Sequence, residues 1–135
     1  MRHDRHMNTT FQIAQEVPKC SDQKVAAIIV SKNNVISVGS NQPKTHPMVA
    51  HNQHDDWCEY LHAEASAIIN ALRQIGRRKL AKCDMYVCRA KLVMGHYRWG
   101  LAKPCPNCTQ FLKAYPVRNV YYSTEETGVY EKADD

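Results

Sequence analysis

Apolar residues recur along the chain with two different periods, and each period predicts a kind of element. Spacing of three and four residues predicts two helices, and Pro106 opens a third because proline suits the first helical position. The predicted helices cover residues 9–17, 62–75 and 106–115. Apolar, β-branched runs predict strands. The predicted strands cover residues 24–31, 35–40, 84–90 and 117–124.

Caps and turns give the boundaries of these elements. A threonine at residues 9–10 is the expected N-cap of the first helix, which ends at Pro18. Gly76 is expected just past the end of the second helix. The turn "KNN" joins the first two strands into a hairpin.

The last two strands are joined through a helix, so we expect them to be parallel with a right-handed crossover. The order predicts an α/β fold with a mixed sheet of about four strands. We expect one domain over residues 1–135 with an acidic tail at 125–135. Residues 41–59 form a long polar loop, and residues 91–102 form an excursion with its own small hairpin.

The composition indicates a globular chain, with 44% apolar and 23% charged residues. No apolar run approaches the roughly 18 residues of a membrane span, and the N-terminus lacks the apolar region of a secretory signal. We therefore expect a cytoplasmic protein with no membrane partner. Six cysteines in such a chain indicate thiols and metal ligands rather than disulfides.

The net charge of +5 is unevenly distributed. Residues 125–135 hold five of the 13 acids and one of the 18 bases, so the body carries 17 bases against 8 acids, or +9. Such a field suits an anionic ligand, either a nucleotide phosphate or a nucleic acid. Solubility alone would also account for it.

Three residues form a predicted zinc site. Cys105 and Cys108 lie three apart at the start of a predicted helix, where the helix dipole favours thiolates. His62 opens another predicted helix and offers a third ligand. Three protein ligands with an open fourth position are typical of a catalytic rather than a structural zinc. Glu64, two residues after His62, is placed to act as a general acid and base without binding the metal.

His62-Ala63-Glu64 and the later Pro104-Cys105-Pro106-Asn107-Cys108 resemble the signature of the zinc-dependent cytidine and deoxycytidylate deaminase superfamily. The resemblance covers nearly the whole chain and implies that family's three-layer α/β/α fold. It implies Zn²⁺ as the cofactor, held by His62, Cys105 and Cys108, and Glu64 as the catalytic proton shuttle. It also implies that the Ala63 and Cys105 amides contact the reacting centre.

Further residues are candidates for binding the substrate. Asn41 aligns with an asparagine that contacts the sugar in relatives, although a turn asparagine after a strand is an equal alternative. Lys44, His46, Arg89 and Arg98 are candidate partners for a phosphate. Trp99 could stack on a base or cap the site, although the tip of a solvated hairpin is the simpler interpretation.

A second metal site is a weaker hypothesis. His51, His54 and Cys58 have ligand-like spacing in the long loop, but no clear fourth ligand accompanies them. A polar loop near the active site is the preferred interpretation.

The leading functional hypothesis is hydrolytic deamination of a free cytosine nucleoside or nucleotide, most simply dCMP to dUMP with release of ammonia. The alternatives are guanine as substrate and deamination of a base in nucleic acid, such as tRNA adenosine or single-stranded DNA cytosine. A third hypothesis is a catalytically silent, zinc-stabilised subunit. The resemblance also implies a homo-oligomer, and a compact deaminase suits phage or bacterial nucleotide metabolism.

Overall fold

The computed structural model describes residues 2–17, 24–41, 62–103 and 106–133. In chain order the elements are α1 (Arg2–Glu16), β1 (Lys24–Ser31), β2 (Asn34–Ser40), α3 (Ala63–Leu80), β3 (Asp84–Val93), β4 (His96–Gly100), α4 (Pro106–Ala114), β5 (Asn119–Ser123) and β6 (Tyr130–Lys132). No helix in these ranges is long and apolar enough to cross a membrane.

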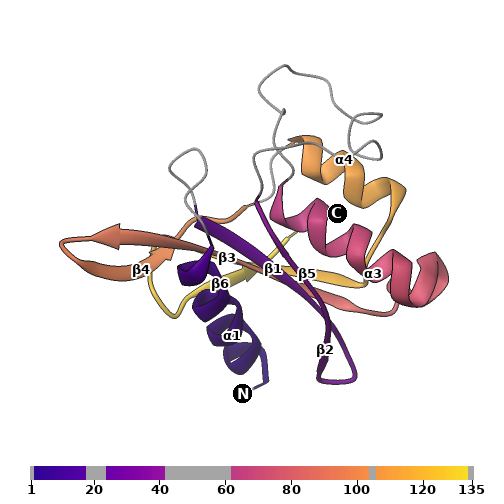
Figure 1. Cartoon of the computed structure of the whole chain (residues 1–135), viewed down its shortest axis with the longest axis horizontal. Coiled ribbons are helices and arrows are strands. Elements are labelled where there is room, and N and C mark those ends of the chain that lie inside the picture. The colour runs from indigo at the N-terminus through magenta and orange to yellow at the C-terminus, as the bar shows by residue number, and fades with distance from the viewer. Residues whose placement is uncertain (1, 18–23, 42–61, 104–105, 134–135) are drawn as a thin grey trace.

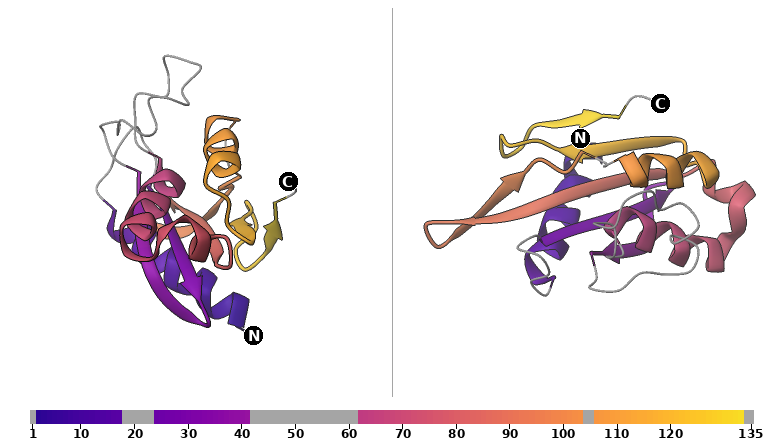
Figure 2. Two further views of the ribbon diagram at one scale, coloured as in Figure 1. Left: turned by 90° about the vertical axis from the view of Figure 1, so that its right-hand side faces the viewer. Right: turned by 90° about the horizontal axis from the view of Figure 1, so that it is seen from above.

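The elements form three layers around one mixed sheet (Figures 1 and 2). The strand order is β2-β1-β3-β5-β6, and β4 pairs with the far end of β3. Helix α1 packs on one face against β1 and β3, while α3 and α4 cover the other face. The α/β/α prediction and the parallel pairing of β3 with β5 through α4 are confirmed.

The sheet has six strands among the described residues, so the prediction of about four was too low. β3 runs on to Val93 and turns back into β4 through Met94 and Gly95, whose positive φ angles of 52° and 83° suit a two-residue hairpin. β6 lies inside the predicted acidic tail and pairs antiparallel with β5. Its three residues are too few to show a strand period in the sequence.

Helix α1 begins at Arg2 instead of at the threonines expected to cap it. The hydroxyls of Thr9 and Thr10 donate to the carbonyls of Arg5 and His6 at 3.0 and 2.7 Å, as they do inside a helix. The additional turns are polar in sequence and are held by tertiary contacts. His3 Nδ1 lies 2.6 Å from the Tyr86 hydroxyl, and Met7 is fully buried.

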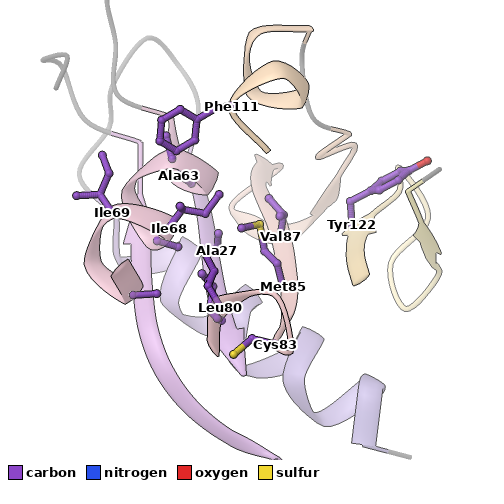
Figure 3. Close-up of a cluster of buried hydrophobic side chains, with 14 of the residues drawn as sticks. Ala27, Ala63, Ile68, Ile69, Leu80, Cys83, Met85, Val87, Phe111 and Tyr122 are labelled. Atoms are coloured by element: carbon purple, nitrogen blue, oxygen red, sulfur yellow. The ribbon is translucent and has the colours of Figure 1, made fainter. Parts of the chain in front are cut away.

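Two apolar cores hold the layers together, one on each face of the sheet. On the α1 face, Met7, Ile28 and Trp99 are among the buried members. The larger core lies between the sheet and helices α3 and α4 (Figure 3). Its members with side chains under 2% exposed include Ile29, Ile68, Leu80, Met85 and Val87.

Candidate active site

The candidate site is built on the first turn of α3, where His62 precedes the helix as its N-cap. His62 has an extended backbone (φ −74°, ψ 155°), and its carbonyl accepts the first helical hydrogen bond from the Ser66 amide at 3.0 Å. Its imidazole makes no capping bond with the helix and is half-buried. Glu64 is only 6% exposed, and carboxylates are rarely buried to this extent unless they are paired. The N-terminal end of the helix dipole stabilises negative charge at this position.

Strand β2 holds this turn of α3 in place. Gly39 approaches the helix so closely that a Cβ atom there would lie 2.3 Å from the Ala67 amide nitrogen and 2.5 Å from the Ala63 carbonyl oxygen. The hydroxyl of Ser37 donates to the Ala67 carbonyl at 2.6 Å. Further along, the Asn70 amide donates to the Val38 carbonyl at 2.9 Å. The backbone that carries His62 and Glu64 is therefore fixed to the sheet.

Helix α4 starts near this turn. Cys108 occupies its first turn, and Phe111, one turn later, is buried in the same core as Ala63 (Figure 3). Positions three apart share one face of a helix. Cys105 and the side chain of Cys108 lie outside the described residues, so the distances among the three predicted ligands are not part of the structure.

The residues that are present suit zinc. Within the described part of the chain, no group of three or more potential ligands occurs. His62 nevertheless offers an imidazole nitrogen at one helix start, and Cys108 belongs to the first turn of the helix beside it. Nitrogen and sulfur donors at helix N-termini are the donors that Zn²⁺ prefers.

Two of the predicted substrate-binding residues lie at or beside this turn. Ala63 is 1% exposed and is the first residue of α3. Asn41 follows β2, two residues after Gly39, on the face of the sheet that α3 covers. The side-chain Oδ1 of Asn41 accepts from the Val25 backbone amide at 3.1 Å, and the backbone amide of Asn41 donates to the Val25 carbonyl at 3.2 Å. These bonds continue the β1–β2 ladder, so Asn41 has a structural role of its own.

Two others lie on β4, away from that turn. Trp99 is 3% exposed and packs on the α1 face of the sheet, with its ring centroid 6.3 Å from that of Phe11. The sheet therefore separates the Trp99 ring from Glu64. Arg98 is exposed and lies opposite Lys91 in the hairpin. His46 and the proposed second metal ligands His51, His54 and Cys58 are outside the described residues.

Arg89, one of the four candidate phosphate partners, lies on the face of the sheet that α3 covers. Arg89 pairs with Val25 on one side and Gly100 on the other, and it shares a face with the buried Val87 under α3. Among the described residues, its buried Nε has no hydrogen-bond partner. The sequence named Arg89 only as one of four candidates, because the cross-strand register that places it beside Val25 is a tertiary property.

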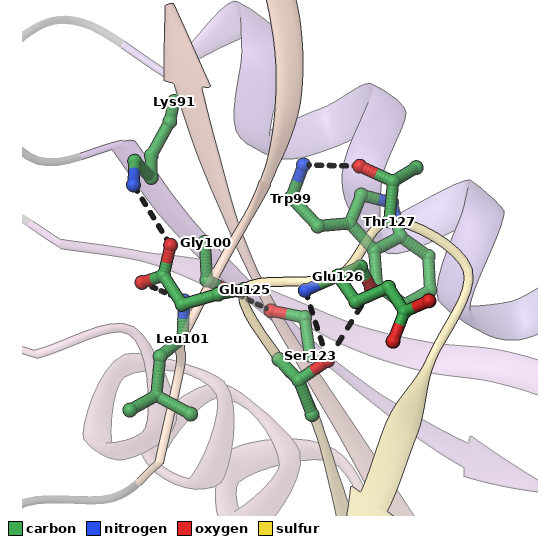
Figure 4. Close-up of polar contacts among 9 residues, drawn as sticks. Lys91, Trp99, Gly100, Leu101, Ser123, Glu125, Glu126 and Thr127 are labelled. Atoms are coloured by element: carbon green, nitrogen blue, oxygen red, sulfur yellow. Dashed lines mark hydrogen bonds and ion pairs between the residues drawn. The ribbon is translucent and has the colours of Figure 1, made fainter.

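Two carboxylates away from the candidate site, Asp84 and Glu125, have lowered pKa values because of nearby hydrogen-bond donors. Burial alone raises the pKa of the Asp84 carboxyl, but hydrogen bonds from Arg118 and Asn119 outweigh it, so the pKa lies below its usual value. Hydrogen bonds from Lys91 and the Leu101 amide lower the pKa of the Glu125 carboxyl (Figure 4). Both carboxylates bind other parts of the chain and so have structural roles.

The buried thiol of Cys88 is unreactive for a different reason. Burial raises its pKa to about 12, against the opposing effect of its hydrogen bond with Ser123. A thiol with such a pKa stays protonated at neutral pH and is a poor nucleophile and metal ligand. Cys88 is therefore a structural residue of the core.

Three solved structures resemble the chain at low sequence identity. The dCMP deaminase of cyanophage S-TIM5 in apo form superposes with a TM-score of 0.62 at 22% identity, covering 93% of this chain and 85% of that one. Its complex with dCMP and dUMP gives 0.61 at 21% identity, with 89% and 79% covered. The guanine deaminase of Bacillus subtilis gives 0.59 at 22% identity, with 92% and 65% covered. At these identities the likeness shows the fold alone.

A comparison with curated protein sequences found no match. The family model described as the cytidine and deoxycytidylate deaminase zinc-binding region matches residues 1–124, which span both sequence motifs and all elements from α1 to β5. This chain therefore belongs to the cytidine and deoxycytidylate deaminase family.

Proposed function

We propose that the protein catalyses zinc-dependent hydrolytic deamination of a free cytosine nucleotide, converting dCMP and water to dUMP and ammonia. The observation that carries the proposal is the buried carboxylate of Glu64, two residues after the N-cap His62, in a turn fixed to the sheet. Membership of the family and the likeness to a phage enzyme crystallised with dCMP and dUMP support it.

His62, Cys105 and Cys108 would hold the zinc, which supplies Lewis-acid activation of water at neutral pH. Glu64 would take a proton from that water and deliver it to N3 of the cytosine ring. It would then carry a second proton to the amino group at C4, which leaves as ammonia. Burial of Glu64 excludes bulk water from the path of these protons.

The substrate's other parts need residues beyond the reacting centre. Asn41 and Arg89 flank Val25 on the face of the sheet that carries α3. We assign the sugar to Asn41 and the phosphate to Arg89, since a guanidinium binds phosphate oxygens with good geometry. Because the Oδ1 of Asn41 already accepts a backbone bond, its side-chain amide is the group that would donate to the sugar.

The test is a mass-spectrometric deamination assay of zinc-loaded protein on dCMP, deoxycytidine, cytidine, guanine, tRNA and single-stranded DNA. We expect dCMP to be converted, and Glu64→Ala to lower kcat by about 10²–10⁴-fold, the usual worth of a positioned proton carrier. Glu64→Gln is the matched variant, because it preserves volume while removing the titratable group.

Zinc content measured by mass spectrometry should be the same in all three proteins. Activity of Glu64→Ala within tenfold of wild type would exclude the proposed role of Glu64. Conversion of guanine or of a polymer instead of dCMP would keep the chemistry and change the substrate.

A further inference from the structure

One stretch of the chain is almost free of acids. Residues 65–124 contain eleven bases and a single acid, Asp84, whose charge is engaged by Arg118 at 2.8 Å. The bases are Arg73, Arg77, Arg78, Lys79, Lys82, Arg89, Lys91, Arg98, Lys103, Lys113 and Arg118. Lys91 is paired with Glu125, which belongs to the acidic tail. The excess positive charge noted in the body of the protein is therefore concentrated in α3, α4 and the strands between them.

Part of this charge lines a cleft of about 570 Å³ beside α4. The cleft runs between α4 and the two last strands, β5 and β6, which lie on the same flank of the molecule (Figure 2). Its polar lining includes Lys103, Lys113, Arg118, Thr109 and Asn119. Among the described residues that line it, none is acidic. A cleft of this size with one sign of charge is suited to an anion.

The positive surface continues around the C-terminal ends of the two helices. The Arg77 guanidinium lies 5.7 Å from the ring centroid of Tyr115, which joins the end of α3 to the end of α4. Arg78, Lys79 and Lys82 are exposed just beyond it. Helix dipoles account for basic residues in the last turns of α3 and α4, and the ion pair with Asp84 accounts for Arg118, but neither accounts for Lys103 or Lys82.

The cleft and this end surface together are longer than one nucleotide requires. Helix α4 has nine residues, or about 13 Å at 1.5 Å per residue, and the bases extend beyond both of its ends. Lys103 lines the cleft at the end where the chain enters α4. An extended polyanion with exposed bases matches this shape, since positive grooves with aromatic edges are typical of proteins that bind single strands.

We propose that the cleft beside α4, continued by the basic ends of α3 and α4, binds single-stranded nucleic acid. Phosphates contact Lys103, Lys113 and Arg78 along this path, and the Tyr115 ring is positioned at its bend. The binding is a property of this surface and does not depend on which base the candidate active site deaminates.

The experiment is fluorescence anisotropy with a labelled 20-nucleotide single strand of RNA or DNA at several salt concentrations. It uses the full zinc-loaded chain carrying Glu64→Ala, so that turnover is slowed during the measurement. The test variant adds Lys113→Ala and Arg78→Ala, two exposed positions on the proposed path. The control adds Arg5→Ala on α1 and Lys32→Asn in the β1–β2 turn, which removes the same charge elsewhere, and asparagine tolerates the positive φ of 50° at residue 32.

We expect the test pair to weaken binding at least tenfold and to reduce the slope of log K against log salt by about 1.4, or about 0.7 for each phosphate that the variant no longer neutralises. The control pair should keep the slope of the parent. If the test and control variants weakened strand binding equally, the proposal would be overturned, because the attraction would then depend on net charge and not on this surface. Absence of salt-dependent binding, preference for a duplex of the same length, or full displacement by a mononucleotide would overturn it as well.

Two further readouts separate the possibilities. Sedimentation of the test pair should match the parent, since a change in self-association would show that the cleft is an interface between copies of the chain. Strand binding without activity on any substrate would contradict the proposed function alone, whereas deamination of dCMP without strand binding would contradict only this inference.

Discussion

At the scale of single residues, Gly39 is the position on which the candidate site most depends. Gly39 faces the backbone of α3 at Ala63 and Ala67. At this point the helix backbone contacts the strand backbone directly, with no side chain between them. The turn that carries His62 and Glu64 can lie this close to the sheet only because residue 39 has no Cβ.

Gly39→Ala is expected to displace the first turn of α3. The new methyl would meet backbone atoms that cannot rotate away, and overpacking of this kind costs about 1–3 kcal/mol of the free energy of unfolding. Activity should fall further than stability, since Glu64 moves with the turn. Val38→Ala is the matched control, because Val38 precedes Gly39 on β2 and is 41% exposed, so its truncation leaves the contact with α3 in place. Thermal unfolding and kcat of both variants test this, and equal behaviour would contradict it.

Asp84 makes stability depend on pH. Its pKa is lowered in the folded state by Arg118 and Asn119, so its contribution to stability is complete above the usual aspartate pKa of about 3.9. That contribution is lost as the pH falls from there through the lower folded-state value. Asp84→Asn should therefore have a lower Tm than wild type at pH 7, and the difference should shrink as the pH falls below the usual aspartate pKa of about 3.9. A difference in Tm that does not shrink as the pH is lowered would show that packing, not charge, is responsible.

At the scale of elements, α3 consists of an apolar helix and a separate basic turn. The break is at Gly76 (φ 77°, ψ 170°), where the sequence had predicted the end of the helix. After it, Arg77, Arg78 and Lys79 form a turn that ends at the buried Leu80. The sequence prediction of a glycine terminator was confirmed, but the additional turn depends on Leu80 packing in the core.

Gly76→Ala is expected to lower the free energy of unfolding by about 1–3 kcal/mol. No atom lies within 4 Å of the added methyl, so the cost comes only from a backbone conformation that is restricted to glycine. Gln74→Ala, at an exposed position of the same helix, should change stability little. Denaturant unfolding measures both, and a stabilised Gly76→Ala would mean that the backbone relaxes into a continuous helix.

At the scale of the whole molecule, the acidic tail completes the sheet. β6 pairs with β5 from Tyr121 to Ser123, and the Ala133 amide donates to the Val120 carbonyl at 2.8 Å. The tail also reaches β4, because the Thr127 hydroxyl accepts from the Trp99 amide and Glu125 binds Lys91 (Figure 4). The homo-oligomer implied by the family resemblance stays a prediction.

Truncation after Thr127 should expose that edge. An unpaired strand edge promotes association with other chains, so we expect self-association and a lower Tm. Removal of residues 134–135 alone is the control, because it deletes two acids and leaves β6 in place. Light scattering during size-exclusion chromatography measures the result, and a monodisperse truncated protein of unchanged Tm would show that β6 does not protect the edge.

Local patterns in the sequence predicted the three helices, the strands β1, β2, β3 and β5, their order and the parallel crossover. They did so because side-chain period and caps act over a few residues. Only the tertiary structure decided that α1 starts at Arg2, that Trp99 packs away from Glu64 and that a strand forms inside the tail. Those outcomes depend on contacts between residues far apart in sequence, such as His3 with Tyr86 and Trp99 with Thr127. A pattern that spans a few residues cannot predict the free energy of such contacts.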